Sequence, residues 1–156
     1  MQVKDCMKQN VYSISPATTT AEAAQIFISK HVGSLPVIDQ QGKLVGLLQL
    51  RDLLELVLPD FLKILDDFDF VHSFGAVETR KPSEAMLANP ISKLMQAPVS
   101  VEADSGLLRA FSLLHKHQIH DLPVVDENDL LVGIVSRVDV GTAFLSKWNV
   151  TKAGES

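Results

Sequence analysis

Residues 122–140 read LPVVDENDLLVGIVSRVDV, and residues 35–53 carry a close copy of them, LPVIDQQGKLVGLLQLRDL. The copies keep a proline, two aspartates and a glycine in register, and the members of each pair stand 87 residues apart: Pro36 and Pro123, Asp39 and Asp126, Gly46 and Gly133, Asp52 and Asp139. An ungapped internal repeat indicates a duplicated structural unit, so the rest of the chain is interpreted as two copies of one pattern.

The first copy begins before the quoted stretch. Its apolar spacing and turn residues predict a strand, a helix, a hairpin of two strands and a second helix, at residues 11–14, 18–32, 35–39, 44–50 and 51–58. Thr18 or Thr19 is the expected N-cap of the first helix, because Glu22 follows within its first turn. Pro59 is expected to end the second helix.

The second copy repeats the order β-α-β-β-α at residues 99–101, 103–119, 122–126, 131–136 and 137–145. Asp104 or Ser105 is the expected cap of its long helix, and the expected inward face carries Leu107, Ala110, Phe111 and Leu114. Neither half has a large core alone. We therefore predict an α/β fold in which two β-α-β-β-α repeats pack about a pseudo-two-fold axis, with grooves between them near the strand ends.

The composition is that of a soluble globular protein, with 46% hydrophobic and 21% charged residues. No apolar run approaches the roughly 18 residues that span a bilayer. The N-terminal MQVKDCMKQN lacks the apolar core of a signal peptide and Cys6 is the single cysteine, so a cytoplasmic protein is expected. The net charge of −5 argues against non-specific nucleic-acid binding, which depends on clustered Lys and Arg.

The two copies resemble the tandem cystathionine-β-synthase (CBS) domain pair, also called a Bateman module. The resemblance covers about residues 1–57 and 89–146, and it rests on LPVID and LPVVD followed by GLLQLRD and GIVSRVD. These match the family's pattern of a glycine, hydrophobic residues, Thr or Ser, two variable residues and Asp. The resemblance implies a first repeat, a helical insert with a linker, a second repeat and a C-terminal tail at residues 1–58, 59–88, 89–146 and 147–156.

The first candidate nucleotide site is centred on Asp139. An aspartate at a helix start can accept hydrogen bonds from both hydroxyls of a ribose, and a serine three residues earlier can donate to a phosphate near the helix amides. Asp139 thus suits the ribose and Ser136 the phosphate, with Arg137 between them. The resemblance adds four residues of the other repeat: Val11, Tyr12, Val32 and Gly33. The alternative is that Ser136 and Asp139 only cap the last helix.

The second candidate site is centred on Asp52, and the resemblance adds to it Pro98, Val99, Ile119, His120 and Asp121. This site departs from the family pattern because Gln49 stands where Thr or Ser is expected. Gln49 can donate a hydrogen bond, but its longer side chain fills space that a phosphate needs. Arg51 is interpreted either as a phosphate ligand or as a solvated arginine on the helix surface. The Asp139 site is therefore ranked first.

Other clusters of polar residues do not form a convincing catalytic or metal site. His115, His117 and His120 are close in sequence, but on a helix residues 115 and 117 point about 200° apart, and no cysteine completes a site. The acidic DDFDF at residues 66–70 lacks the glycine turn of a calcium loop and is interpreted as a solvated face. No nucleophile has a visible base, so no enzyme, metal or obligatory cofactor is expected.

The insert is the part that departs from a minimal CBS pair. Its first half predicts a helix with an apolar stripe that consists of Phe61, Ile64, Leu65, Phe68 and Val71. Residues 75–90 predict a polar, interrupted loop. The stripe either covers the chain's own core or docks a partner or a second subunit.

The expected function is a regulatory ligand-sensing module that binds AMP, ADP or ATP between the repeats and signals to an unidentified partner protein. A homodimer is expected through the helices that follow each motif, whose apolar residues are Leu53, Leu54, Val57, Val140 and Phe144. The alternative is a structural dimerisation module with empty or non-nucleotide clefts. A catalytic or metal-dependent role has the least support.

Overall fold

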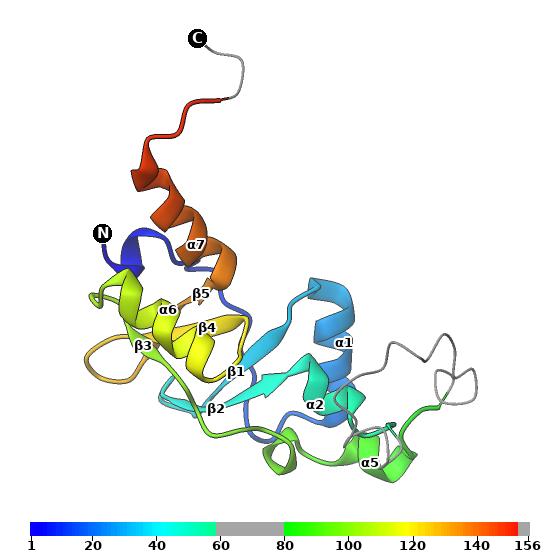
Figure 1. The fold of residues 1–156 in the computed structure, drawn as a ribbon. Helices are drawn as coiled ribbons and strands as arrows, with labels where there is room; N and C mark the ends of the chain where they lie inside the picture. Colours follow the sequence, from blue (N-terminus) through cyan, green and yellow to red (C-terminus); the bar gives the residue numbers. More distant parts are fainter. Residues whose placement is uncertain (59–79, 153–156) are drawn as a thin grey trace.

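The computed structural model describes residues 1–58 and 80–152, which form two similar halves (Figure 1). The predicted α/β class is confirmed. The first repeat comprises α1 (Thr20–Lys30), β1 (Ser34–Ile38), β2 (Leu44–Gln49) and α2 (Leu50–Leu54). The second repeat comprises β3 (Val101–Glu102), α6 (Leu107–Lys116), β4 (Asp121–Val125), β5 (Leu131–Ser136) and α7 (Arg137–Leu145).

Four shorter helices of the described residues lie outside the predicted β-α-β-β-α order: η1 (Val3–Asp5), α5 (Glu84–Ala88), η2 (Ile91–Lys93) and η3 (Ser146–Trp148). The expected loop at residues 75–90 is thus partly wrong, since Ser83 caps α5 by accepting a hydrogen bond from the Met86 amide at 3.2 Å. The stripe predicted for residues 61–71 lies outside the described residues. None of the helices in the described ranges is long and apolar enough to cross a bilayer.

The repeated aspartate of LPVID and LPVVD forms the hairpin turn in both halves. β1 pairs with β2, and β4 pairs with β5, in antiparallel hairpins. Asp39 Oδ1 accepts hydrogen bonds from the amides of Gln41 and Lys43, both at 2.9 Å. Asp126 Oδ1 accepts the equivalent bonds from residues 128 and 130 at 2.8 and 3.0 Å. Because each side chain satisfies two turn amides, this aspartate has a local structural role.

The leading strands are shorter than predicted. The strand expected at residues 11–14 is a single parallel bridge between Ile14 and Val37. Pro16 follows two residues later and cannot donate to a ladder, which limits the pairing. The strand expected at residues 99–101 is β3, which spans only Val101–Glu102 and pairs with β4 in parallel.

Two of the predicted helix starts differ in outcome. Thr19, one of the two candidates, caps α1: its hydroxyl accepts from the Glu22 amide at 3.1 Å, and Glu22 accepts from the Thr19 amide at 3.0 Å. The cap expected at Asp104 or Ser105 is wrong, because α6 starts after Gly106. Ser105 is engaged elsewhere: its hydroxyl donates to Glu102 at 3.2 Å, and its carbonyl accepts from Val3.

The inward faces of the long helices are largely as expected. Leu107, Ala110 and Leu114 of α6 are buried. Phe111 is the exception, because it is 45% exposed and packs edge-on against Phe144, with ring centroids 6.4 Å apart. The helix predicted for residues 51–58 is also shorter, ending as α2 at Leu54.

The two hydrophobic cores exchange their leading arms. We call residues 1–8 the N-terminal arm and residues 89–96 the connecting arm. Val3 of the N-terminal arm is fully buried in the core of the second repeat, and the blue N-terminal segment lies beside α7 (Figure 1). Ile91 of the connecting arm is fully buried in the core of the first repeat. Each repeat is therefore completed by the arm that precedes the other repeat.

The repeated glycine is required where these arms cross the hairpins. A Cβ atom on Gly133 would lie 2.6 Å from Met7 Sδ and 3.0 Å from the Lys8 carbonyl oxygen. A Cβ atom on Gly46 would lie equally close, at 2.6 Å, to the sulfur of Met95 in the connecting arm. Since real Cβ atoms do not approach so closely, the glycine of each motif makes room for the exchanged arm.

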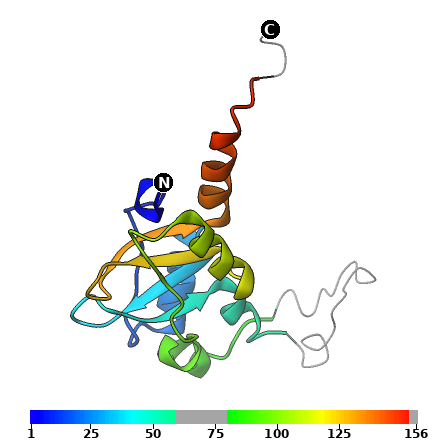
Figure 2. The ribbon, with the colours of Figure 1, turned by 60° about the vertical axis from the view of Figure 1, so that its left-hand side comes forward.

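Equivalent residues of the two repeats meet at the pseudo-two-fold axis. Ser34 and Asp121 are equivalents separated by 87 positions, and the Ser34 hydroxyl donates to Asp121 Oδ2 at 3.2 Å. Lys43 and Leu130, also equivalent, form an antiparallel bridge. A contact between equivalent residues must lie on the axis that relates them. The hairpins of both halves therefore meet in the middle of the molecule, with the helices outside them (Figure 2).

Candidate functional site

A cavity of about 340 Å³ lies at the junction of the two repeats. It contains all four residues predicted from the first repeat, and its lining is Lys8, Asn10, Val11, Tyr12, His31, Val32, Gly33, Ser34, Asp121 and Ile134. Tyr12 is 39% exposed, and Lys30 Nζ lies 4.9 Å from the centre of its ring. We refer to this cavity as the first cleft.

Ser136 and Asp139 stand together at the start of α7. The Ser136 oxygen accepts from the Asp139 amide at 3.0 Å, and Asp139 Oδ2 accepts from the Ser136 amide at 2.8 Å. This is a capping box, so the helix-capping role considered for the pair is present. Lys8, which lines the first cleft, places Nζ 3.9 Å from the same Oδ2 atom. Asp139 is thus joined to the first cleft through Lys8.

Arg137 is held by the end of the preceding helix and its loop. Its Nε donates to the Ile119 carbonyl at 3.0 Å, and its Nη2 donates to the Leu114 carbonyl at 3.2 Å. Arginine is suited to bind two carbonyls at a helix end because its guanidinium is planar and carries several donors. The predicted ligand residue therefore has a structural task between α6 and α7.

Asp52 occupies the equivalent position at the start of α2 and is only 9% exposed. Its Oδ2 accepts from the Gln49 amide at 2.7 Å, and Gln96 Nε2 lies 3.5 Å from its Oδ1. Burial raises the pKa of Asp52, while the Gln49 amide and the charge of Arg51 act in the opposite direction. The buried carboxyl is thus less favourable in its charged form than an exposed one.

The residues predicted beside Asp52 differ in burial. Ile119 is buried in the core of the second repeat, and Val99 packs against that core. Pro98 and His120 are exposed, and the His120 carbonyl accepts from the Arg137 amide at 3.0 Å. Asp121 lies on the pseudo-two-fold axis and lines the first cleft.

A comparison with known protein families agrees with this architecture. The family model of the CBS domain matches residues 3–59 and again residues 91–146. The chain belongs to the CBS domain family. It carries two CBS domains in tandem, and both matched segments include the arm that packs on the other repeat.

Relatives of this CBS pair are known from a plant and a bacterium. CBSX1, a chloroplastic CBS domain-containing protein of Arabidopsis thaliana, is 31% identical over 143 residues, which are 88% of this chain and 61% of CBSX1. YhcV of Bacillus subtilis is 32% identical over 145 residues, 92% of this chain and 86% of YhcV. The crystal structure of CBSX2 in complex with AMP superposes with a TM-score of 0.70 at 30% identity, covering 95% of this chain and 98% of the crystallised chain.

Sequence reasoning missed Lys8 and Gln96, the two arm side chains that contact the motif aspartates. Lys8 directly follows Met7 in the N-terminal arm, and Gln96 directly follows Met95 in the connecting arm. Both methionines face the motif glycine of the other CBS domain. Alignment of the two arms on their methionines would have identified these positions as equivalents, although not their contacts.

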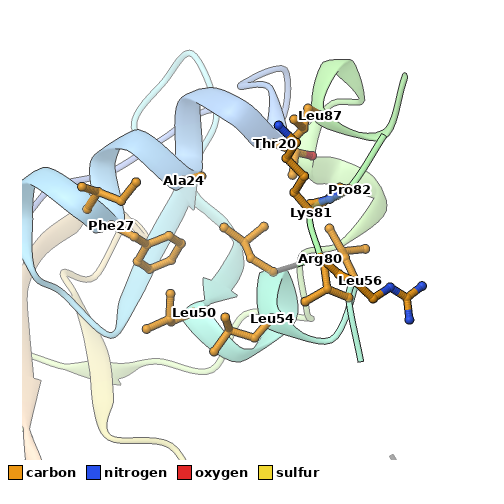
Figure 3. A pocket seen from close by; sticks show the side chains of 13 residues that line it. Thr20, Ala24, Phe27, Leu50, Leu54, Leu56, Arg80, Lys81, Pro82 and Leu87 are labelled. Atoms are coloured by element: carbon orange, nitrogen blue, oxygen red, sulfur yellow. The ribbon is translucent and has the colours of Figure 1, made fainter. Parts of the chain in front are cut away.

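A second cavity of about 340 Å³ lies away from the motif aspartates, between α1, α2 and α5 (Figure 3). Phe27, Leu50 and Leu54 point into it, whereas the guanidinium of Arg80 points away from these apolar side chains (Figure 3). Its lining residues lie on both sides of the undescribed residues 59–79. Its described lining is mostly apolar, and no carboxylate is found among the lining residues that lie within residues 1–58 and 80–152.

The histidine cluster is resolved into separate environments. His115 stacks on Phe111 within α6, with ring centroids 6.3 Å apart, and His117 follows the last turn of that helix. Within residues 1–58 and 80–152, no three His, Cys, Asp or Glu side chains gather as metal ligands would.

Proposed function

We propose that this CBS pair is a regulatory, non-enzymatic module that binds an adenosine nucleotide, AMP, ADP or ATP, between its repeats and signals the bound state to a partner protein. The observation that carries the proposal is the position of Lys8, which lines the first cleft beside Val11 and Tyr12 and also contacts Asp139. The AMP complex of CBSX2, which is 30% identical, supports an adenosine ligand.

Each part of a nucleotide has a suitable partner in this proposal. The adenine base packs on Val11, Tyr12 and Val32, where an aromatic ring and two apolar side chains border the first cleft. The ribose hydroxyls donate to Asp139. The phosphate accepts from the Ser136 hydroxyl and from the first amides of α7, a nine-residue helix whose N-terminus favours anions.

Helix capping and ligand binding are compatible at Asp139. Both of its contacts, from the Ser136 amide and from Lys8, use Oδ2, so Oδ1 can accept from a ribose hydroxyl. The Ser136 oxygen acts as an acceptor in the cap, and its hydroxyl hydrogen can still be donated to a phosphate. The capping box therefore orients both side chains before the ligand arrives.

The second cleft remains part of the proposal at lower rank. It would combine Asp52 and Gln49 with Arg51 and the predicted residues around Pro98 and His120. Asp52 is more buried than Asp139, and Gln96 already contacts its second oxygen. A ribose would have to displace or share that contact, which argues for weaker binding.

The alternative function is a structural dimerisation module with empty clefts. Exposed apolar side chains on the motif helices favour self-association in either case: Leu50 and Leu54 on α2, and Val138 and Leu145 on α7, are 40% to 71% exposed. Of the dimer residues predicted from sequence, Val140 is instead fully buried in the core. We propose a cytoplasmic homodimer with an as yet unidentified regulated protein; light scattering would measure the dimer.

Isothermal titration calorimetry with AMP, ADP and ATP tests the binding function. Asp139→Ala should lower the affinity of the first cleft by about 1.5–3 kcal/mol, or roughly 10- to 150-fold, because the carboxylate no longer accepts from the ribose. Glu22→Ala is the matched control, since Glu22 is the equivalent acid in the capping box of α1 and does not line the first cleft. It should leave the affinity unchanged.

Two results would contradict this assignment. If the wild type binds none of the three nucleotides, the dimerisation module is the better interpretation. If Asp52→Ala lowers the affinity more than Asp139→Ala does, the order of the clefts is reversed. A thermal-shift panel that adds NAD, S-adenosylmethionine and divalent metals would reveal a different ligand class.

A further inference from the structure

The two motif aspartates meet side chains of different charge. Asp139 faces the ammonium of Lys8 at 3.9 Å, whereas Asp52 faces the neutral amide of Gln96 at 3.5 Å. Lys8 and Gln96 are equivalents by structure as well as by sequence. Lys8 forms a bridge with Ile134 in β5, and Gln96 forms the same bridge with Leu47 in β2.

A second pair of equivalent positions differs in the same direction. His31 lines the first cleft, and Gln118 stands 87 residues later at the equivalent position. Both have a left-handed backbone with φ of 52°, so the two side chains leave the chain in the same way. A residue that can carry positive charge in the first cleft is thus replaced by a glutamine at both equivalent positions of the other half.

The remaining charges do not remove this difference. Asp121 lines the first cleft, but it meets its equivalent Ser34 on the pseudo-two-fold axis, so its charge does not distinguish the two halves. Arg51 lies next to Asp52 on α2 and is exposed. Its effect on the pKa of Asp52 is opposed by the negative charge of Glu55 one turn later. The side chain of Lys8 is 65% exposed, which leaves its ammonium within reach of a ligand in the first cleft.

We propose that Lys8 and Gln96 make the two clefts select ligands by charge: the Asp139 cleft takes a phosphorylated adenosine nucleotide, and the Asp52 cleft takes an adenosine derivative without a negative charge. The inference rests on the proposed nucleotide-binding function and adds the class of ligand that each cleft binds. Lys8 offsets the charge of Asp139, so a phosphate enters a region of lower negative potential. Gln96 is neutral, so it does not offset the charge of Asp52. The Asp52 carboxylate therefore repels a phosphate, although its oxygens can still accept hydrogen bonds from ribose hydroxyls.

Calorimetry with two probes separates charge selection from general damage to the cleft. AMP and adenosine share the base and the ribose, and only AMP carries the phosphate. Lys8→Gln gives the first cleft the glutamine of the second. The affinity for AMP should fall about three- to tenfold, and the affinity for adenosine should change less than twofold. Added salt should lower the affinity for AMP more in the wild type than in Lys8→Gln, because salt screens the attraction between the Lys8 ammonium and the phosphate.

The reciprocal exchange tests the Asp52 cleft. In an Asp139→Ala background, which leaves the Asp52 cleft intact, adenosine should bind at least as tightly as AMP. Adding Gln96→Lys should raise the affinity for AMP about three- to tenfold and leave the affinity for adenosine unchanged.

The outcomes separate the inference from the function on which it rests. Equal losses of AMP and adenosine in Lys8→Gln would overturn charge selection and show that Lys8 only positions Asp139. An AMP affinity unaffected by Lys8→Gln, in a protein that binds AMP, would also overturn it and leave the proposed function standing. A wild type that binds neither probe would instead refute the proposed function.

Discussion

The exchange of arms between the CBS domains predicts that a residue near the N-terminus stabilises the second domain. Val3 is fully buried among residues of β3, α6, β4, β5 and α7, although it lies at the start of the first domain in sequence. Val3→Ala leaves the backbone contacts of the arm in place, including the bond from the Val3 amide to the Ser105 carbonyl at 2.9 Å. The variant therefore isolates the packing of one side chain.

The magnitude follows from the burial. Val3→Ala removes two methyl groups from a site with no solvent exposure, and a buried group of this size contributes about 0.8 kcal/mol, or about 1.6 kcal/mol for two. The cavity left behind adds to this loss where the surrounding core does not relax. We expect the free energy of unfolding to fall by about 1.5–3 kcal/mol.

Urea denaturation measures the loss, and hydrogen exchange locates it. Val138→Ala is the matched control, because Val138 is 71% exposed on α7 and its truncation should change stability by less than about 0.5 kcal/mol. Amides of β4 and β5 should exchange faster in Val3→Ala, relative to the wild type, than those of β1 and β2. A Val3→Ala variant as stable as Val138→Ala, or one that loosens only the first domain, would refute the exchanged arms.

Two further predictions concern charged groups. Burial raises the pKa of Asp52, so its contribution to stability is present below the unfolded pKa and is lost as the pH rises through the folded value. In urea titrations, the free energy of unfolding of Asp52→Asn relative to the wild type should therefore rise between about pH 4 and pH 7. An equal difference in this free energy at both pH values would count against the prediction. Burial, then the charges of Asp139 and Asp5, raise the pKa of the Cys6 thiol. Asp139→Asn should lower this pKa and speed alkylation of Cys6 by iodoacetamide at about pH 8; an unchanged rate would show that the Asp139 charge does not reach the thiol.

Errors of the sequence analysis occurred where a distant segment competes with a local preference. Thr19 caps α1 as expected, because a capping box needs only residues within one turn. Ser105 has the right chemistry for a cap but serves the N-terminal arm instead, through its carbonyl. Phe111 has helical spacing for the core, yet it packs against Phe144 at the surface. Local pattern cannot show such competitors.

The candidate site divides in the same way. The equivalence of Asp52 and Asp139, and the difference between Gln49 and Ser136, are visible in the sequence because the repeat has no gaps. The placement of Lys8 beside Asp139 is not, since the two residues are far apart in the chain and meet only through the bridge between Lys8 and Ile134.

The sequence by itself determined the repeated β-α-β-β-α order, the hairpin turns that follow Asp39 and Asp126, and the motif helices, because these depend on periodicity, caps and turns within a few residues. Only the tertiary structure decided which arm completes which core. Val3 and Ile91 are both apolar and β-branched, and both fill the same position in the two related cores. Burial of apolar surface has no direction, so the choice between a domain's own arm and its neighbour's is made by how the chain packs as a whole.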